Sequence, residues 1–283
     1  MTVLDQATHL RQIAQRLAPK AQTIAITSGK GGVGKTNLAV NLAATLAALR
    51  RRVVLLDADM GLANADILVN VQPRFNLAHV VAGQRTLAEV ITPTPAGFSL
   101  IAGASGLARM ADLTEADRRR LVSQLETLQS ACDVLIIDTG AGIGRNVLAF
   151  AVPADHVVIV TTPEPTAITD AYAVIKVLVR CGATGRMSVM VNQAKNREEA
   201  RVVHERVSGV ARQFLQTDIT FGGYVVTDPA VSQAVRKRTT FVQASPHCPA
   251  TQCVTAWANR IDSHVEVPAA RRNFFARLAG WWR

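Results

Sequence analysis

The chain has 283 residues, of which 49% are hydrophobic, 18% are charged and 5% are aromatic. This balance excludes a disordered or fibrous chain and favours one large α/β domain with an aliphatic core. The formal net charge of +10 favours an anionic partner, such as nucleic acid or the surface of an acidic membrane.

The cysteines indicate a reducing compartment. Cys132, Cys181, Cys248 and Cys253 are scattered along a chain whose start has no basic-then-apolar leader. His247, Cys248 and Cys253 could supply three metal ligands, but no second cluster completes a tetrahedral site, so we interpret them as part of a Pro-rich loop. No apolar run approaches the roughly 20 residues that cross a bilayer, and we expect a cytoplasmic protein, soluble or peripheral on a membrane.

The first predicted element is an amphipathic helix from Leu4 to Leu17, which Pro19 ends. Leu10, Ile13 and Ala14 share its apolar face with Leu17. By periodicity alone, this segment is a helix that packs on the sheet.

A phosphate-binding loop follows the predicted strand from Thr23 to Thr27. It consists of Gly29, Lys30, Gly31, Gly32, Val33, Gly34, Lys35 and Thr36. A predicted helix starts at Lys35, and its residues from Asn37 to Leu49 carry apolar side chains at helical spacing. Small residues let successive backbone N–H groups surround a phosphate, and the helix N-terminus points its dipole at the same anion. Lys35 adds a cation and Thr36 offers a hydroxyl to Mg²⁺, so the loop predicts binding of ATP and Mg²⁺.

Lys30 is a second lysine that an ordinary phosphate-binding loop does not require. With it, the loop resembles that of the deviant Walker A ATPases, which include MinD, ParA and the nitrogenase iron protein. The resemblance implies that Lys30 reaches across a dimer interface to the phosphates of the partner's nucleotide. It therefore implies an ATP-dependent homodimer.

Two further predicted strands bring aspartates toward this loop, because parallel strands present their ligands at their carboxyl ends. The strand from Val53 to Leu56 is followed by Asp57 and Asp59, and this stretch resembles switch I of the same ATPases. The resemblance implies that Asp59 orients the attacking water and that Asp57 lies near Mg²⁺. An Asx turn at a strand end is the structural alternative for this stretch.

A second acidic strand end lies about a hundred residues beyond the loop. The strand from residue 133 to 137 ends at Asp138, which can lie beside Mg²⁺ opposite the Thr36 hydroxyl and resembles Walker B and switch II. Gly140 stands where MinD usually has proline. This departure favours a resemblance to FlhG, a MinD-like ATPase of the same family, over MinD itself.

The rest of the domain alternates strands with helices. Residues 70–106 carry weak signals apart from a short strand at 98–101, and the arginine triplets at 50–52 and 118–120 are interpreted as a helix cap and a solvated helix face. Predicted strands at 156–161, 187–192 and 219–226 alternate with helices at 166–179, 197–214 and 229–235. This rhythm predicts an α/β P-loop fold with a doubly wound, mostly parallel sheet flanked by helices.

Asn192 ends one of these predicted strands. In the family that the loop resembles, an asparagine at this place hydrogen-bonds the adenine ring, and Asp228 with Pro229 falls in the loop that covers the base. A strand-end asparagine that caps a turn is the alternative.

The last residues form a basic amphipathic segment. Arginines surround one helical face that carries five large apolar residues. These residues are Phe274, Phe275, Leu278, Trp281 and Trp282. The pattern suits the boundary of an anionic inner membrane and resembles the targeting tails of MinD and FlhG, whereas a helix docked on the core is the alternative. One such helix binds weakly and a dimer presents two, so attachment would depend on ATP.

The N-terminal residues Asp5, Gln6 and Ala7, followed by Leu10 and Arg11, resemble the DQAxxLR motif of the FlhG/FleN family, MinD-like ATPases that control flagellar number and placement. The resemblance implies that Gln6 enters the active site of the GTPase FlhF, while Leu10 and Arg11 dock the helix.

We therefore expect a partner-activating helix at 1–20, an ATPase domain at 21–264 and a membrane-targeting tail at 265–283. Together they would form a slow ATPase switch, peripheral on the cytoplasmic face of the inner membrane, that regulates flagellar number or placement with FlhF. Flagellar switch proteins and a flagellar transcription regulator are further candidate partners, and no sequence-specific DNA binding is expected. The alternatives are a MinD- or ParA-type ATPase for division or DNA segregation, an iron–sulfur reductase, and a non-catalytic adaptor.

Overall fold

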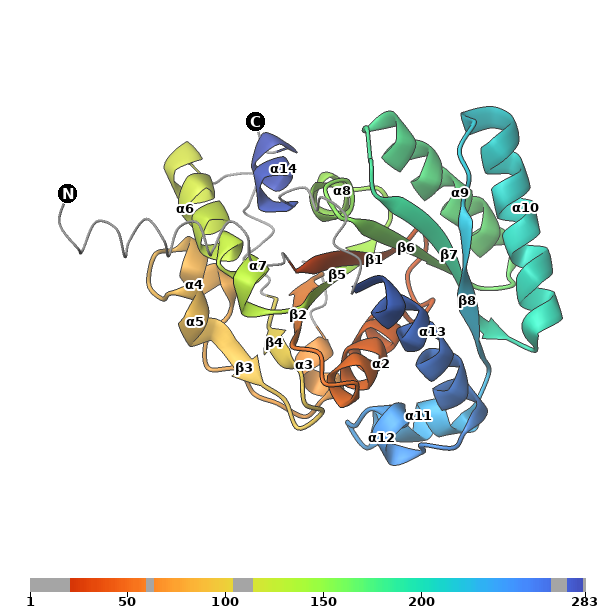
Figure 1. Ribbon diagram of the computed structural model, residues 1–283, viewed down its shortest axis with the longest axis horizontal. Coiled ribbons are helices and arrows are strands. Elements are labelled where there is room, and N and C mark those ends of the chain that lie inside the picture. Colours follow the sequence, from red (N-terminus) through yellow and green to blue (C-terminus); the bar gives the residue numbers. More distant parts are fainter. Residues whose placement is uncertain (1–20, 60–63, 104–113, 266–273, 282–283) are drawn as a thin grey trace.

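The computed structural model describes residues 21–59, 64–103, 114–265 and 274–281, which build an eight-stranded sheet with helices on both faces (Figure 1). The strands are β1 (Gln22–Ser28), β2 (Val53–Ala58), β3 (Ile91–Pro93), β4 (Ser99–Ile101), β5 (Val134–Ala141), β6 (His156–Thr161), β7 (Arg186–Ala194) and β8 (Thr220–Val226). Their order across the sheet is β3-β4-β2-β5-β1-β6-β7-β8. Only β3 pairs antiparallel, with β4, so the predicted doubly wound, mostly parallel fold is confirmed.

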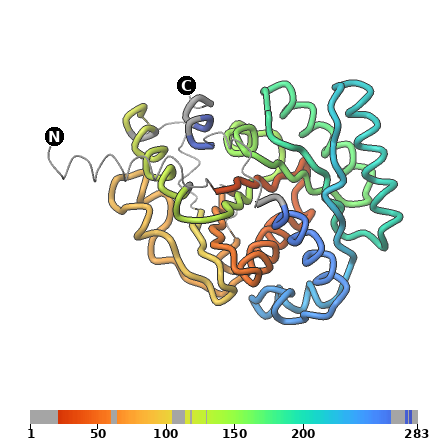
Figure 2. Tube along the Cα trace, in the orientation of Figure 1, coloured from red at the N-terminus to blue at the C-terminus, as the bar shows by residue number. Residues whose placement is uncertain are grey.

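The helices form a layer on each face of the sheet (Figures 1 and 2). One layer holds α2 (Lys35–Ala48), α3 (Ala65–Leu68), α11 (Pro229–Arg236), α12 (Phe241–Ala244) and α13 (Pro249–Val265). The other holds α4 (Leu77–Val81), α5 (Leu87–Val90), α6 (Glu115–Glu126), α7 (Leu128–Ala131), α8 (Arg145–Ala151), α9 (Pro165–Arg180), α10 (Arg197–Leu215) and α14 (Phe274–Trp281). A sheet covered on both faces explains why its central strands are nearly continuous apolar runs.

The register of the central strands brings the predicted acidic residues together. Strand β1 lies between β5 and β6, and β2 pairs with β5 so that Asp57 is opposite Asp138. All four of these strands are parallel, so the loop after β1 lies at the same edge as both aspartates. Helix α2 is held against the sheet by Leu38, Leu42 and Leu46, each at most 2% exposed, and burying such a side chain contributes about 1.5–3 kcal/mol.

Some element boundaries differ from those predicted. Strand β5 continues to Ala141, so Asp138 lies inside a strand and not at its end. Helix α2, by contrast, begins at Lys35 as predicted, where Gly34 with φ 91° adopts a left-handed conformation and ends the loop. Beyond α2, Arg51 and Arg52 make ion pairs with Asp262 and Asp133, which tie this turn to α13 and to the start of β5. The N-terminal residues Asp5 to Arg11 lie outside the described residues.

The C-terminal helix α14 packs on α6 and α8 (Figure 2). Phe274, Phe275 and Leu278 are each at most 1% exposed and belong to the apolar core, and the two phenyl rings meet edge to face at 4.8 Å. The structure thus differs from the free membrane-binding face that the sequence suggests, because these side chains already have a protein partner. Trp282 and the side chain of Trp281 lie outside the described part of the chain.

Among the described helices, none combines the length and the apolar character needed to cross a bilayer. The same part of the chain contains no group of three or more His, Cys, Asp or Glu residues arranged to hold a metal ion, and its cysteines are all free thiols.

Candidate nucleotide site

The phosphate-binding loop joins β1 to α2 at the carboxyl edge of the sheet, and its glycines have steric reasons. A Cβ at Gly29 would overlap the backbone of Asp170 in α9, and one at Gly34 would overlap the side chain of Asn192. At Gly31 and Gly32, by contrast, no described atom lies within 4 Å of an added Cβ. The loop is therefore packed on one side and open on the other, as a cradle for phosphate requires.

Asp138 is the most buried charge of the site. It is 0% exposed, and neither of its carboxyl oxygens has a hydrogen-bond partner among the described residues. Burial, with a smaller effect of Asp57, raises the pKa of Asp138 to about 8, while the nearby Thr36 hydroxyl and the Lys35 ammonium oppose that rise. A buried carboxylate without donors, beside a hydroxyl, fits a divalent cation, so Thr36 and Asp138 fit Mg²⁺.

Lys35 is 7% exposed and points its charge into the same place. Burial lowers the pKa of Lys35, whereas the carboxylates of Asp138 and Asp59 act to raise it. The ammonium therefore lies near both aspartates, where it can neutralise an outer phosphate.

Asp57 is 1% exposed, and its two oxygens accept backbone N–H groups of Asp59 at 3.1 Å and Ala65 at 3.2 Å. The bond from Asp59 forms the Asx turn that is the structural alternative for this stretch. Burial raises the pKa of Asp57 to about 6 despite these two donors. Asp57 thus anchors both ends of the switch segment, of which residues 60–63 are outside the described residues, and a role near Mg²⁺ stays a prediction.

Asp59 lies against switch II. A Cβ at Gly140 would be 3.3 Å from the Asp59 Oδ1 atom, so a larger residue at position 140 would crowd this carboxylate. Glycine at this position therefore leaves room for the Asp59 carboxylate beside β5.

Lys30 contacts the segment where α9 begins. Its Nζ atom lies 2.6 Å from Glu164 Oε2 and 3.3 Å from Thr166 Oγ1, at the start of α9. Both partners of the ion pair are exposed, at 42% and 60% of their side chains. The pair is therefore weak and can exchange for another anion, since exposed ion pairs contribute about 0.2–1 kcal/mol.

A pocket of about 250 Å³ adjoins the loop at Gly34. Its walls are apolar side chains from α2, β8, α11 and α12, with Asn192 and Asp228 among the polar lining. The Asn192 Nδ2 atom donates to the Val33 carbonyl at 2.8 Å, which leaves its side-chain oxygen to accept from a ligand. Asp228 caps α11 by accepting from the Ala230 N–H at 2.9 Å.

The structure brings together the predicted residues of the loop, both switches and Asn192. Sequence reasoning missed three residues: Glu164 holds Lys30, Asp170 lies against Gly29, and Phe241 lines the pocket beside the loop. Glu164 is the N-cap of α9, Asp170 belongs to α9 and Phe241 to α12, and no sequence motif marks them.

Comparisons with known proteins agree with this site. The AAA domain model AAA_31 matches residues 21–188. The antiactivator FleN of Pseudomonas aeruginosa is 40% identical over 242 residues, which are 86% of this chain and 86% of FleN. The flagellum site-determining protein YlxH of Helicobacter pylori is 35% identical over 262 residues, 90% of this chain and 88% of YlxH. The chain belongs to the FleN/FlhG family.

Solved structures of MinD share the fold of this FleN/FlhG-family chain. A chain of the MinC–MinD cell division complex of Aquifex aeolicus is 26% identical, with a TM-score of 0.70 over 88% of this chain and 98% of that one. The Mg-ADP complex of MinD from Pyrococcus horikoshii has a TM-score of 0.73 at 22% identity, over 88% of this chain and 99% of that one, and shows the shared fold.

Proposed function

We propose that this FleN/FlhG-family ATPase is a nucleotide-driven switch that binds Mg·ATP, dimerises, attaches to the inner membrane and regulates flagellar number or placement. The observation that carries the proposal is the convergence of Lys35, Thr36, Asp59 and Asp138 on one open loop, with Lys30 held loosely at its rim. The names of the relatives, an antiactivator and a flagellum site-determining protein, support the flagellar role.

Hydrolysis would use the residues of this loop. Thr36 and Asp138 would hold Mg²⁺, which when bound neutralises phosphate charge. The loop N–H groups and Lys35 would hold the developing charge of the transferred phosphoryl group, and Asp59 would orient a water molecule. Asn192 would accept from the adenine amino group with the oxygen that its bond to Val33 leaves available.

Dimerisation would exchange the partner of Lys30. In the structure this lysine pairs with Glu164, and in the dimer it would pair with the phosphates bound by the other subunit. A triphosphate carries more charge than one carboxylate, and the exchange sacrifices only an exposed ion pair. Lys30 would thereby make dimerisation depend on ATP.

Membrane attachment would require α14 to leave the core, because Phe274, Phe275 and Leu278 cannot pack on the domain and enter lipid together. Arg277 fastens the helix: its Nη2 atom lies 3.0 Å from Asp155 Oδ1, and both side chains are less than a quarter exposed. The other Asp155 oxygen accepts from the Thr23 backbone N–H at 3.0 Å and from the Thr23 hydroxyl at 2.7 Å. Asp155 therefore connects α14 directly to the central strand β1.

We expect Asp155→Asn to increase membrane binding without altering the sequence of the tail. Loss of this half-buried ion pair weakens docking by about 1–1.4 kcal/mol, which would raise the ratio of liposome-bound to free protein, without nucleotide, about five- to tenfold. Co-sedimentation with vesicles containing anionic lipid measures the fraction. Asp218→Asn is the control, since it removes an ion pair with Arg212 that is 70% and 83% exposed. Unchanged binding of a folded Asp155→Asn protein would contradict the proposal.

The proposed partner of the N-terminal segment is a FlhF-like GTPase. By family resemblance, Gln6 enters the partner's active site, so we expect Gln6→Ala to remove most of the stimulation of FlhF GTP hydrolysis while leaving ATP turnover unchanged. Arg11→Ala should instead weaken binding to FlhF and raise the concentration of this protein that gives half-maximal stimulation. Full stimulation of FlhF by the Gln6→Ala protein would contradict the proposed role of Gln6.

Two other readings share the ATPase site. Relatives named for septum placement, such as MinD of Synechocystis, are 37% identical but over 61% of this chain, which supports the flagellar branch over the division branch. A ParA-like DNA role would use the basic surface, and retention on duplex DNA that survives deletion of residues 271–283 would favour it. Flagellar switch proteins and a transcription regulator remain proposed partners, the latter supported by the name antiactivator.

A further inference from the structure

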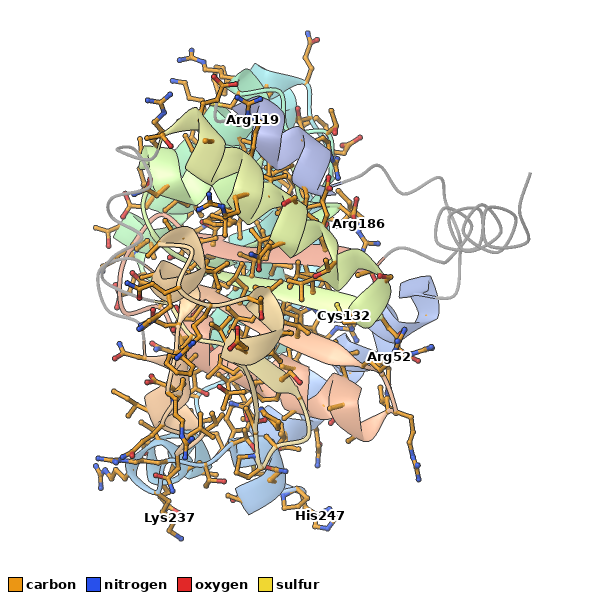
Figure 3. The ribbon with its side chains drawn as sticks, turned by 90° about the vertical axis from the view of Figure 1, so that its left-hand side faces the viewer. Arg52, Arg119, Cys132, Arg186, Lys237 and His247 are labelled. Atoms are coloured by element: carbon orange, nitrogen blue, oxygen red, sulfur yellow. The ribbon has the colours of Figure 1, made fainter. Side chains whose placement is uncertain are left out.

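A second cavity lies at the edge of the sheet opposite the phosphate-binding loop, where β6 and β7 begin. Its volume is about 110 Å³, and its polar lining is His156, Arg186, Ser188, Thr220, Trp257 and Arg260. No acidic residue belongs to the described lining. Figure 3 shows Arg186 at the same end of the sheet as Arg52 and Cys132, which precede β2 and β5. The cavity is thus separate from the nucleotide site.

Hydrogen bonding at His156 determines what the cavity offers. The Arg186 Nη2 atom lies 3.3 Å from His156 Nδ1, and because a guanidinium only donates, Nδ1 accepts and the ring proton lies on Nε2. Nε2 lies 2.7 Å from Ser188 Oγ, so His156 donates to the serine and cannot act as its base. The pair is therefore not a nucleophilic dyad. The Ser188 hydroxyl remains protonated and can donate a hydrogen bond to an acceptor.

Two more donors belong to this lining. Trp257 is 1% exposed, and its Nε1 atom has no hydrogen-bond partner within the described residues. Arg260 uses Nη2 to donate to the Gly222 carbonyl at 2.7 Å and has further N–H groups. A buried donor without an acceptor is unfavourable, so this set of donors favours a bound anion.

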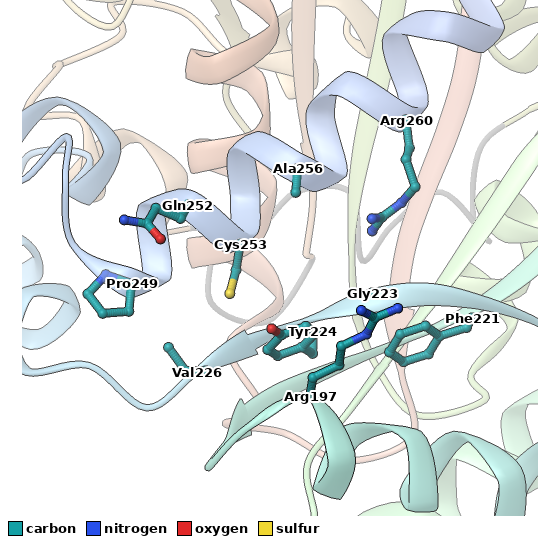
Figure 4. A pocket seen from close by; sticks show the side chains of 10 residues that line it. All are labelled: Arg197, Phe221, Gly223, Tyr224, Val226, Pro249, Gln252, Cys253, Ala256 and Arg260. Atoms are coloured by element: carbon teal, nitrogen blue, oxygen red, sulfur yellow. The ribbon is translucent and has the colours of Figure 1, made fainter.

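A groove of about 510 Å³ adjoins the cavity along β8, because Phe221 and Arg260 line both. Figure 4 shows Arg260 reaching from α13 and Arg197 from the start of α10 toward β8, beside Phe221 and Tyr224. Partial burial lowers the pKa of Arg260, and the charge of Arg197 lowers it further. The two guanidinium groups therefore repel one another, and an anion bound beside Arg260 would reduce this repulsion.

We propose that the cavity and the groove bind a small anionic ligand, whose carboxylate or phosphate group lies between Arg186 and Arg260 and whose aromatic part lies against Phe221 and Tyr224. A largely apolar groove with a few convergent donors is the usual form of a small-molecule site. An added peptide strand fits less well, because β8 carries a register irregularity at Gly222 and Gly223 and Arg260 already occupies the Gly222 carbonyl.

Calorimetry on the full chain saturated with Mg·ADP tests the proposal, since the P-loop is then filled. We expect phenyl phosphate to bind more tightly than inorganic phosphate and phenol to bind undetectably. Arg260→Gln and Arg186→Gln should each weaken phenyl phosphate binding about tenfold or more. Tyr224→Ala should weaken phenyl phosphate but leave inorganic phosphate unchanged. Arg201→Gln is the matched control, because that arginine pairs with Glu205 on the exposed face of α10.

Three results would overturn the proposal. The first is equal affinity of the parent, Arg260→Gln and Arg186→Gln proteins, each checked for an unchanged melting temperature. The second is loss of phenyl phosphate binding in Lys35→Ala, which would assign the signal to the P-loop. The third is binding of an oligoglutamate peptide without binding of phenyl phosphate, which would assign the groove to an acidic protein segment.

Discussion

Replacing Asp59 with alanine should abolish ATP turnover and leave the protein as an ATP-bound dimer on liposomes. Asp59 lies beside Gly140 of switch II and near Lys35. In the proposed mechanism it holds a water molecule in line with the outer phosphate, and it does not contribute to nucleotide affinity. Removing a positioned acid or base typically slows such a step about 10²–10⁴-fold. Phosphate release measures turnover, and vesicle co-sedimentation with ATP measures the trapped dimer.

Asp66→Ala is the matched control for this substitution. Asp66 belongs to α3, just beyond the same switch, and its Oδ1 atom accepts from the Ile67 N–H at 2.8 Å. We expect ATP turnover by the Asp66→Ala protein to stay within about twofold of that of the parent, as for substitutions outside the site. Normal turnover by Asp59→Ala would remove Asp59 from the proposed role.

Replacing Lys30 with alanine should abolish dimerisation and, with it, ATP-dependent membrane attachment. The side chain of Lys30 faces Glu164 and not its own loop, so its loss leaves the contacts of Lys35 and Thr36 intact. We therefore expect nucleotide binding within about threefold of the parent but a loss of turnover of about 10²-fold or more, as when a charge that stabilises the transition state is removed. Fluorescent nucleotide binding and phosphate release measure the two effects.

Glu164→Gln provides the opposite perturbation at the same contact. It releases Lys30 from an exposed ion pair worth about 0.2–1 kcal/mol, so dimerisation should strengthen by about 1.5- to fivefold. Dimerisation of Lys30→Ala at parental strength would show that the lysine has no role across the interface.

The sequence predicts the sheet well because its strong signals are local. The P-loop stands between an apolar strand and an apolar helix, and Asp57 and Asp138 follow apolar runs, so their position at one edge follows from parallel pairing alone. The predicted end of β5 was wrong, since Thr139 continues the ladder beside β2 and the strand runs through Gly140 to Ala141, although glycine usually signals a turn.

Contacts between distant segments could not be predicted. The docking of α14 depends on an ion pair between Arg277 and Asp155, which lie 122 positions apart, and on packing against α6 and α8. An amphipathic basic helix has the same sequence pattern whether lipid or protein covers it. The Glu164 contact of Lys30 and the cavity at Arg186 and Arg260 are likewise tertiary, and single charged residues at helix and strand ends carry no pattern.

The central claim is that ATP joins two copies of the chain through Lys30. Sedimentation velocity of the full chain with Mg²⁺ and a non-hydrolysable ATP analogue tests it most directly, against the same protein with ADP. The expected result is a species of twice the 30.3 kDa chain mass with the analogue and of the single mass with ADP. A single-mass species at every protein concentration with the analogue would contradict the proposed switch.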